Sequence, residues 1–148
     1  MTQLTRIRLL ALESIRNAIP LMTAQGICRP SDWTGPDDHR LTICIAVELA
    51  ASALIPANSQ VLRPRVTDEA IWLVMRQVAR ANGANQLLQL QALRAQTAAA
   101  KRMQADALDD WQERISSLGV LVIILQRAGQ IDPATPRSST RSLAGGAA

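Results

Sequence analysis

The sequence predicts an all-α protein, a helical bundle of about four helices with a long C-terminal helix and an extended C-terminal tail. Hydrophobic residues make up 48% of the 148 residues, yet aromatic residues make up only 2%. The core must therefore come from Leu, Ile, Val, Ala and Met, and of these Leu, Ala and Met favour helices. The aromatic residues that favour strands are almost absent. We expect one α-helical domain over residues 1–129, followed by a basic Ser/Thr/Pro/Gly/Ala tail over residues 130–148.

The first helix is expected from about Leu4 to the region of Pro20. Its apolar residues recur at helical spacing and form one broad face, with charged residues opposite. Pro20 is expected to kink or end the helix, and Gly26 is expected to end any helical segment that follows Pro20.

The second helix is expected over about residues 37–55, after the connector "CRPSDWTGPDDHR". Thr34 or Gly35 would cap it, with Pro36 at its first position and two acidic residues in its first turn. The segment is apolar almost all round. Such a helix is either central in its own bundle or shared with a neighbouring subunit.

The third helix is expected to begin at Thr67, after an irregular stretch "PANSQVLRPRV", and to end at residues 82–83. Thr67 would be the N-cap, with Asp68 and Glu69 in the first turn. Arg76 and Arg80 are one turn apart, and we expect both to point outward.

The fourth helix is expected to run from Asn85, its cap, to at least Leu118, a length of about 50 Å at 1.5 Å per residue. The run "GVLVIIL" at residues 119–125 would suit a short buried strand, but the helical spacing of the apolar residues favours a helix that continues to Arg127. A helix this long must project beyond its own bundle or pack along a partner.

Basic residues exceed acidic ones by 16 to 12, which gives a formal net charge of +4, and all but Lys101 are arginines. Arginine binds phosphate bidentately, although a GC-rich coding sequence would also enrich it. Arg63 and Arg65 flank a proline, and we expect them, together with Arg76 and Arg80, to contact phosphate or an acidic surface. No ladder of aromatic residues accompanies them, so base stacking is not expected.

No motif assigns a catalytic chemistry, and we expect no catalytic residues, no cofactor and no metal site. Cys28, Cys44 and His39 are too few for the four ligands that zinc needs. The acidic residues of "DDH" at 37–39 suit a helix start, where they would cap the helix rather than catalyse. The carboxylates at positions 106, 110 and 113 share a helix face and could hold Mg²⁺. However, Arg102–Asp106 and Asp110–Arg114 have the i,i+4 spacing of exposed ion pairs, which favours a structural role.

No segment is expected to span a membrane. The apolar run "LTICIAVELAASALIP" carries Glu48 and is shorter than the ~20 residues that a membrane helix needs. The start of the chain has charged residues inside its apolar stretch, so it is not expected to be a signal peptide. We expect the protein in the cytoplasm, or in a virion assembled there.

The tail, residues 130–148, carries Arg137, Arg141 and Leu143 among small and polar residues. It has too little apolar surface to offset the entropy of ordering it alone. We therefore expect these three residues to bind a partner, most simply another copy of the chain.

Two segments, "PDDHRLTICIAVELAASAL" and "VTDEAIWLVMRQVARANGAN", resemble the helical head-to-tail adaptor proteins of tailed phages over about residues 37–85. The resemblance is one of alanine-rich helices on either side of a loop. It implies a ring of copies that docks on a portal ring around the DNA channel, with tails that bind neighbours. The leading hypothesis is thus an oligomeric adaptor in the virion, with portal or other neck proteins as partners and non-specific contact with DNA.

A second hypothesis is a small basic helical nucleic-acid-binding protein, either a regulator or a helical nucleocapsid coat. A small enzyme is a third reading, and the absence of a recognisable nucleophile, metal set or phosphate loop disfavours it.

Overall fold

The computed structural model describes residues 2–59, 61–82, 98–115 and 117–134, and these are mostly helical. They form five α-helices and one 3₁₀ turn, and the only β pairing among them is an isolated bridge between Ile27 and Leu41. The all-α prediction is confirmed. The elements are α1 (Gln3–Gln25), η1 (Pro30–Asp32), α2 (Ile43–Leu54), α3 (Leu62–Asn82), α5 (Ala98–Arg114) and α6 (Leu118–Gly129).

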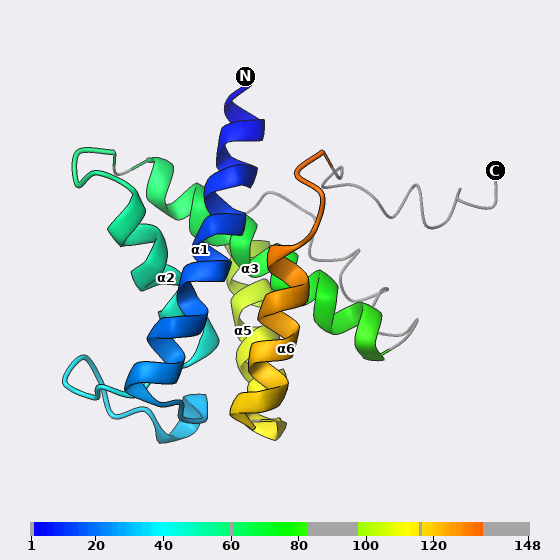
Figure 1. Ribbon diagram of the computed structural model, residues 1–148. Helices are drawn as coiled ribbons and strands as arrows, with labels where there is room; N and C mark the ends of the chain where they lie inside the picture. The colour runs from blue at the N-terminus through cyan, green and yellow to red at the C-terminus, as the bar shows by residue number, and fades with distance from the viewer. Residues whose placement is uncertain (1, 60, 83–97, 116, 135–148) are drawn as a thin grey trace.

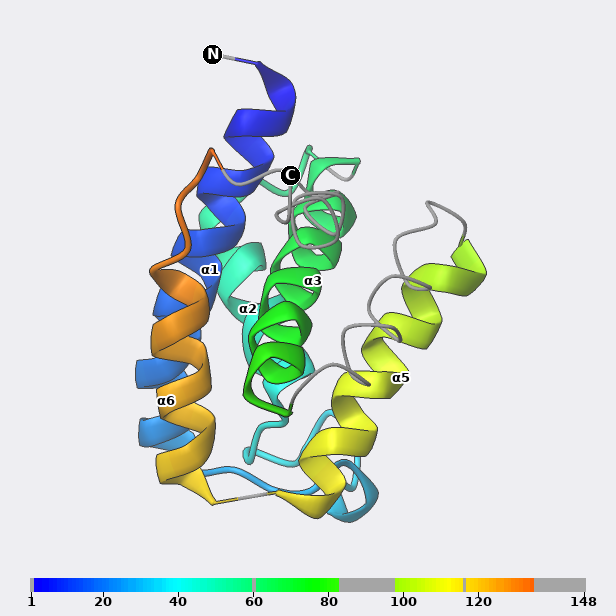
Figure 2. The same ribbon diagram turned by 90° about the vertical axis from the view of Figure 1, so that its right-hand side faces the viewer.

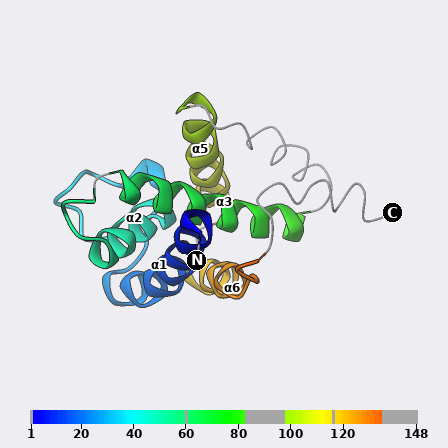
Figure 3. The ribbon, with the colours of Figure 1, turned by 90° about the horizontal axis from the view of Figure 1, so that it is seen from above.

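Helix α3 lies in the middle of the bundle. It packs against α1, α2, α5 and α6. Figure 1 shows α1 and α2 side by side, and Figures 2 and 3 show α5 on one side of α3 and the α1–α6 pair on the other. A helix in such a position needs apolar residues on more than one face, and residues 70–75 of α3 are all buried.

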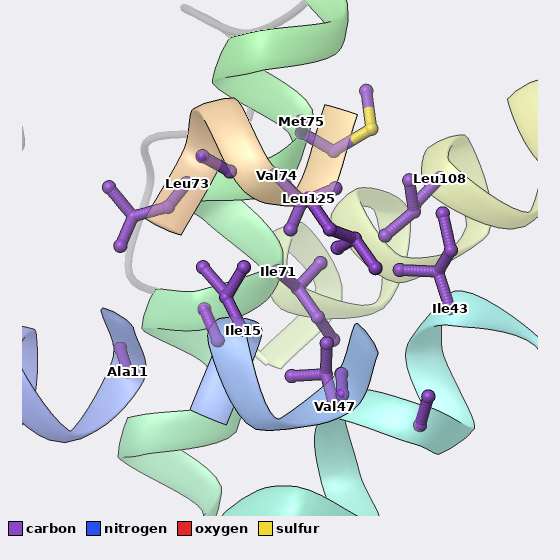
Figure 4. Close-up of a cluster of buried hydrophobic side chains, with 14 of the residues drawn as sticks. Ala11, Ile15, Ile43, Val47, Ile71, Leu73, Val74, Met75, Leu108 and Leu125 are labelled. Carbon is purple, nitrogen blue, oxygen red and sulfur yellow. The ribbon is translucent and has the colours of Figure 1, made fainter. Parts of the chain in front are cut away.

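The core is aliphatic, as the composition predicts. Figure 4 shows side chains from all five α-helices converging, among them Ile15 of α1, Val47 of α2, Val74 of α3, Leu108 of α5 and Leu125 of α6. Alanines on α1 and α2 are also fully buried, which lets these two helices approach closely. Two large rings also belong to the core, those of Trp72 in α3 and Trp111 in α5.

Helix α1 continues through Pro20, so the prediction that it might end there is wrong. Pro20 is exposed and sits inside the helix, whereas Ala18 and Met22 on either side of it are fully buried. Their packing holds the helix together across the missing backbone donor. Gly26 does stop the helix, as expected: its φ is 82°, and its N–H bonds to the Met22 carbonyl.

Helix α2 begins six residues later than predicted. Its N-cap is Thr42, whose hydroxyl accepts from the Ile45 N–H, and residues 37–40 form a loop instead of a first turn. The predicted cap at Thr34 or Gly35 is wrong because Asp38 bonds back to Thr34 and forward to Arg40, which closes a local turn.

Helix α3 begins earlier than predicted, at Leu62, and includes Pro64 in its first turn. Proline is tolerated there because the first N–H groups of a helix have no partner inside it. Thr67, the predicted cap, therefore lies inside the helix. Helix α3 reaches Asn82, and its predicted end at residues 82–83 lies at the edge of the described residues.

The prediction of one continuous fourth helix is wrong, because the chain forms two helices there, α5 and α6. The chain leaves helix α5 after Arg114 and enters α6 at Leu118, and the two helices diverge from that corner (Figure 2). Residues 119–125 are helical, which confirms the helix over the strand. The expected cap at Asn85 and the tail over residues 135–148 lie outside the described residues.

In the part of the chain that the structure describes, none of the helices combines the length and the apolar character needed to cross a lipid bilayer.

Candidate anion-binding site

A pocket of about 570 Å³ opens where α6 ends beside the C-terminal half of α3. We call it the arginine pocket. Helix α3 contributes two arginines and a glutamine; α6 and the turn after it contribute an arginine, a glutamine, an apolar side chain and a carboxylate. Its lining residues are Arg76, Gln77, Arg80, Arg127, Gln130, Ile131 and Asp132.

Two of the arginines are placed where helix geometry favours a cation. Arg80 lies in the last turn of α3 and Arg127 in the last turn of α6. The partial negative charge of a helix C-terminus stabilises a cation there. Both side chains are exposed to water, so neither needs a bound ligand to compensate its charge.

Arg76 differs from the other two because it is buried. Only 8% of it is exposed, so the prediction that it points outward is wrong. It lies one turn before Arg80, beyond the reach of the charge at the helix end. Its Nε and Nη1 atoms are buried and find no hydrogen-bond partner within the described ranges. Such atoms carry a desolvation penalty unless something else accepts from them.

The guanidinium group of Arg76 lies over the face of the Trp72 ring, in a cation–π contact. Its guanidinium carbon lies 5.8 Å from the ring centroid, and that of Arg8 lies at the same distance. Arg8 also pairs with the buried carboxylate of Glu69, with 3.4 Å between Nη2 and Oε1. Burial, and then the charges of Arg80 and Arg8, lower the pKa of Arg76. The positive charge at Arg76 is therefore costly in the absence of a counter-ion.

A second surface feature is an apolar strip on α6. Val120 and Ile123, three residues apart on the outer face, are 39% and 48% exposed. The inner face of the same helix packs in the core through Leu121, Ile124 and Leu125. Residues 118–125 are therefore apolar on both faces. We call the exposed pair on the outer face, Val120 and Ile123, the α6 strip.

The structure does not bring the four predicted arginine contacts together. Arg63 lies at the start of α3, thirteen residues or about 20 Å from Arg76 along the helix. Its Nε and Nη2 atoms donate to the Ile55 carbonyl at 3.2 and 2.8 Å, and Nη2 also donates to the Ser52 carbonyl. Arg63 thus caps the end of α2, and Arg65 beside it is half-buried.

Only Arg76 and Arg80 from the predicted set share a site. Arg127 and Asp132, which complete it, were not predicted, because a straight fourth helix would have carried them away from α3. The expected tail contacts Arg137, Arg141 and Leu143 lie outside the described residues.

The acidic groups that might have indicated catalysis are used as structural contacts. Asp38 accepts from the guanidinium of Arg40 at 2.9 and 3.1 Å, and from both the N–H and the hydroxyl of Thr34. These bonds, the Arg40 side chain first, hold the pKa of Asp38 well below its usual range. Glu113 accepts from the backbone N–H and the hydroxyl of Ser31, which ties α5 to η1.

Both thiols are free cysteines; Cys28 is buried and Cys44 is half-buried. Cys44 points toward α5, where its sulfur lies 3.8 Å from the Ala105 carbonyl. Burial, and then the nearby Asp109, raise the pKa of Cys44 well above its ordinary value. Burial likewise raises the pKa of Cys28. No three His, Cys, Asp or Glu side chains within the described ranges are grouped so that they could hold a metal ion.

Comparison with known proteins finds no matching protein family, no similar curated protein and no similar solved structure.

Proposed function

We propose that this chain is an oligomeric structural protein that acts by binding: an adaptor that docks on a portal ring in the virion of a tailed phage. The α6 strip is the observation that carries the proposal. An adaptor of this kind needs a face that another copy covers, and a second face that suits its docking partner.

The argument for self-association starts from the composition of α6. A surface helix normally has a polar outer face, because apolar side chains in water gain nothing from exposure. In α6 the outer positions 119, 120 and 123 are Gly, Val and Ile. Helix α2 also exposes an apolar side chain, since Leu49 is 45% exposed on a helix whose opposite side packs in the core. Contact with a second copy would remove these side chains from water at a gain of about 25 cal/mol per Å².

The docking partner is expected to be anionic. The arginine pocket presents three guanidinium groups to one carboxylate, so its side chains carry a surplus of positive charge. An acidic surface on a portal ring would complement that charge, and complementary charge speeds association and sets orientation.

Sedimentation analysis of the purified chain tests the assembly. The double variant Val120→Asp/Ile123→Asp should shift the protein from oligomer to monomer while leaving its helical circular dichroism unchanged. Val61→Asp is a matched control, because Val61 is 76% exposed in the turn before α3, away from α6. A wild-type chain that sediments as a monomer at all concentrations would refute the proposal.

Deletion of residues 133–148 tests the role expected of the tail. The truncated chain should keep its helical signal and lose the ring-shaped particles that negative-stain images of the full chain are expected to show. Normal rings from the truncated chain would exclude the tail as an assembly element.

The arginine pocket also favours a second function, contact with nucleic acid. If the pocket binds the DNA backbone, affinity should fall steeply with salt, with a slope of about −0.9 for each phosphate neutralised. Arg80→Gln and Arg127→Gln should each reduce that slope. Binding that is weak and insensitive to both substitutions would favour the adaptor over this function.

A further inference from the structure

We infer that the arginine pocket is a binding site for a dianionic phosphate group, as found in inorganic phosphate or a phosphate monoester. This inference concerns a small ligand, and it depends neither on assembly into rings nor on binding to DNA.

The first argument is the state of Arg76. Burying a guanidinium without hydrogen-bond acceptors is costly, and no described residue accepts from its Nε or Nη1. Trp72 offers only its ring face, which attracts a cation but accepts no strong hydrogen bond from it. An oxyanion in the pocket, which Arg76 lines, would place a negative charge beside this poorly compensated guanidinium.

The second argument is the charge of the pocket. Three arginines face a single carboxylate, Asp132, which leaves a surplus of two positive charges among the lining side chains. A phosphate monoester carries about −1.5 to −2 charges at neutral pH. A carboxylate supplies only one negative charge, and would leave half of the surplus uncompensated.

The third argument is the direction from which the donors come. Arg76, Arg80 and Gln77 come from α3, whereas Arg127 and Gln130 come from the end of α6. Phosphate presents three or more acceptor oxygens in a tetrahedral arrangement, so several donors can reach it from different sides. A carboxylate has two oxygens in one plane, which suits a single guanidinium fork.

Titration calorimetry on the full chain tests the inference, with inorganic phosphate, glycerol phosphate, sulfate and acetate as probes. We expect both phosphates to bind, and sulfate to bind because it is also a tetrahedral dianion. Acetate should not bind measurably. Absence of phosphate binding at about 10 mM, which would nearly saturate a site with a Kd of about 1 mM, would overturn the inference.

Substitutions locate the site. Arg127→Gln and Arg80→Gln change exposed residues, so both variants should fold, and each should weaken phosphate binding by about tenfold or more. Asp132→Asn removes the carboxylate from the pocket and should tighten binding. Arg6→Gln, an exposed arginine in the first turns of α1, is the charge-matched control and should bind phosphate as the wild type does.

Two results from these variants would each overturn the inference. One is equal weakening by Arg6→Gln and Arg127→Gln, which would mean that net charge alone attracts the anion. The other is unchanged or weaker binding in Asp132→Asn.

A short single-stranded oligonucleotide, with and without a 5′-phosphate, distinguishes the monoester from the backbone diester. The 5′-phosphorylated form should compete with inorganic phosphate, and the 5′-hydroxyl form should not. Equal competition by both would show that the pocket takes backbone phosphates and would refute a dianion site. Sedimentation of the same variants without phosphate reports on assembly separately, so the two proposals can fail independently.

Discussion

Arg16 in α1 donates a hydrogen bond of 2.8 Å from Nη1 to the carbonyl of Gly129, the last residue of α6. The stem of Arg16 passes close to Gly129, since a Cβ added to Gly129 would lie 2.8 Å from Cγ of Arg16. The side chain of Arg16 therefore covers the end of α6 only because position 129 has no side chain. This contact joins two helices that are 113 residues apart at these positions.

Gly129→Ala should destabilise the protein, although alanine is the better helix former. The new methyl group overlaps the stem of Arg16, and overpacking of this kind costs about 1–3 kcal/mol. Urea unfolding of both proteins measures the difference. Gly119→Ala is the control: a Cβ there meets nothing closer than 3.8 Å, so this variant should be as stable as the wild type or slightly more stable. Equal stability of the two variants would contradict the contact.

Gln112 on α5 should be one of the least replaceable polar residues. It is fully buried, accepts from the N–H of Ile43 at 2.8 Å, and donates to the carbonyl of Cys28 at 3.1 Å. Gln112→Leu would leave the N–H of Ile43 and the carbonyl of Cys28 without their hydrogen-bond partner. We expect a loss of about 2–5 kcal/mol in the free energy of unfolding.

Gln104, two turns earlier on α5, is the matched comparison for Gln112. It is also buried, but it makes one described hydrogen bond, to the carbonyl of Asp68, which lies within α3. Gln104→Leu also removes a buried oxygen, Oε1, that has no partner among the described residues. It should therefore cost much less than Gln112→Leu. Equal losses in chemical denaturation would show that burial, and not the two bonds, decides the cost.

Asp38 should contribute to stability in a pH-dependent manner. Its folded pKa is lowered, by the Arg40 side chain above all, so its contribution is present above its unfolded pKa, which is near 3.9. The contribution is lost as the pH falls from there toward the folded pKa. The difference in stability between the wild type and Asp38→Asn should therefore be largest above about pH 5 and shrink below about pH 4.

Acid unfolding followed by circular dichroism measures this difference. Asp37→Asn removes the same charge from the neighbouring exposed residue and is the control. A stability difference for Asp38→Asn that stays constant down to low pH would argue against the Asp38–Arg40 pair.

Both cysteines should resist thiol reagents in the folded protein. A thiol reacts as the thiolate, and burial raises the pKa of Cys44 strongly and that of Cys28 to a lesser degree. Labelling with a disulfide reagent at mildly alkaline pH should be slow without urea and complete with it. Cys28→Ser and Cys44→Ser variants assign the rate of each thiol. Fast labelling of Cys44 in the native protein would be inconsistent with its enclosure against α5.

The helices themselves could be predicted because their apolar residues recur at helical spacing. The predicted helix boundaries are wrong where the local sequence gives a misleading signal. Pro64 reads as a breaker, yet it fits the first turn of α3. Residues 115–117, Ile-Ser-Ser, contain neither glycine nor proline, so no helix breaker marks the corner between α5 and α6; the one local signal is Ser117, the N-cap of α6. Packing of α6 on α1, a contact between distant parts of the sequence, decides that corner.

The candidate site could be predicted only in part for the same reason. Arg76 and Arg80 were identified as a pair on one helix face, but a helical projection cannot say which neighbour covers that face. The ring of Trp72 and the end of α6 enclose Arg76, and both depend on the tertiary arrangement. A basic residue near a helix end, such as Arg127, was a usable signal only once the end of α6 was known.

The pairing of α1 with α6 has a consequence for how the protein is made. During synthesis α1 leaves the ribosome before the other described helices, yet one of its partners is α6, the last of them. Until residues 118–129 have emerged, the side of α1 that carries Ile15 and Arg16 has no covering helix, and its apolar surface stays open to chaperones or to premature association. Closure of the bundle must therefore wait for α6, and the nascent chain is most vulnerable just before that helix emerges.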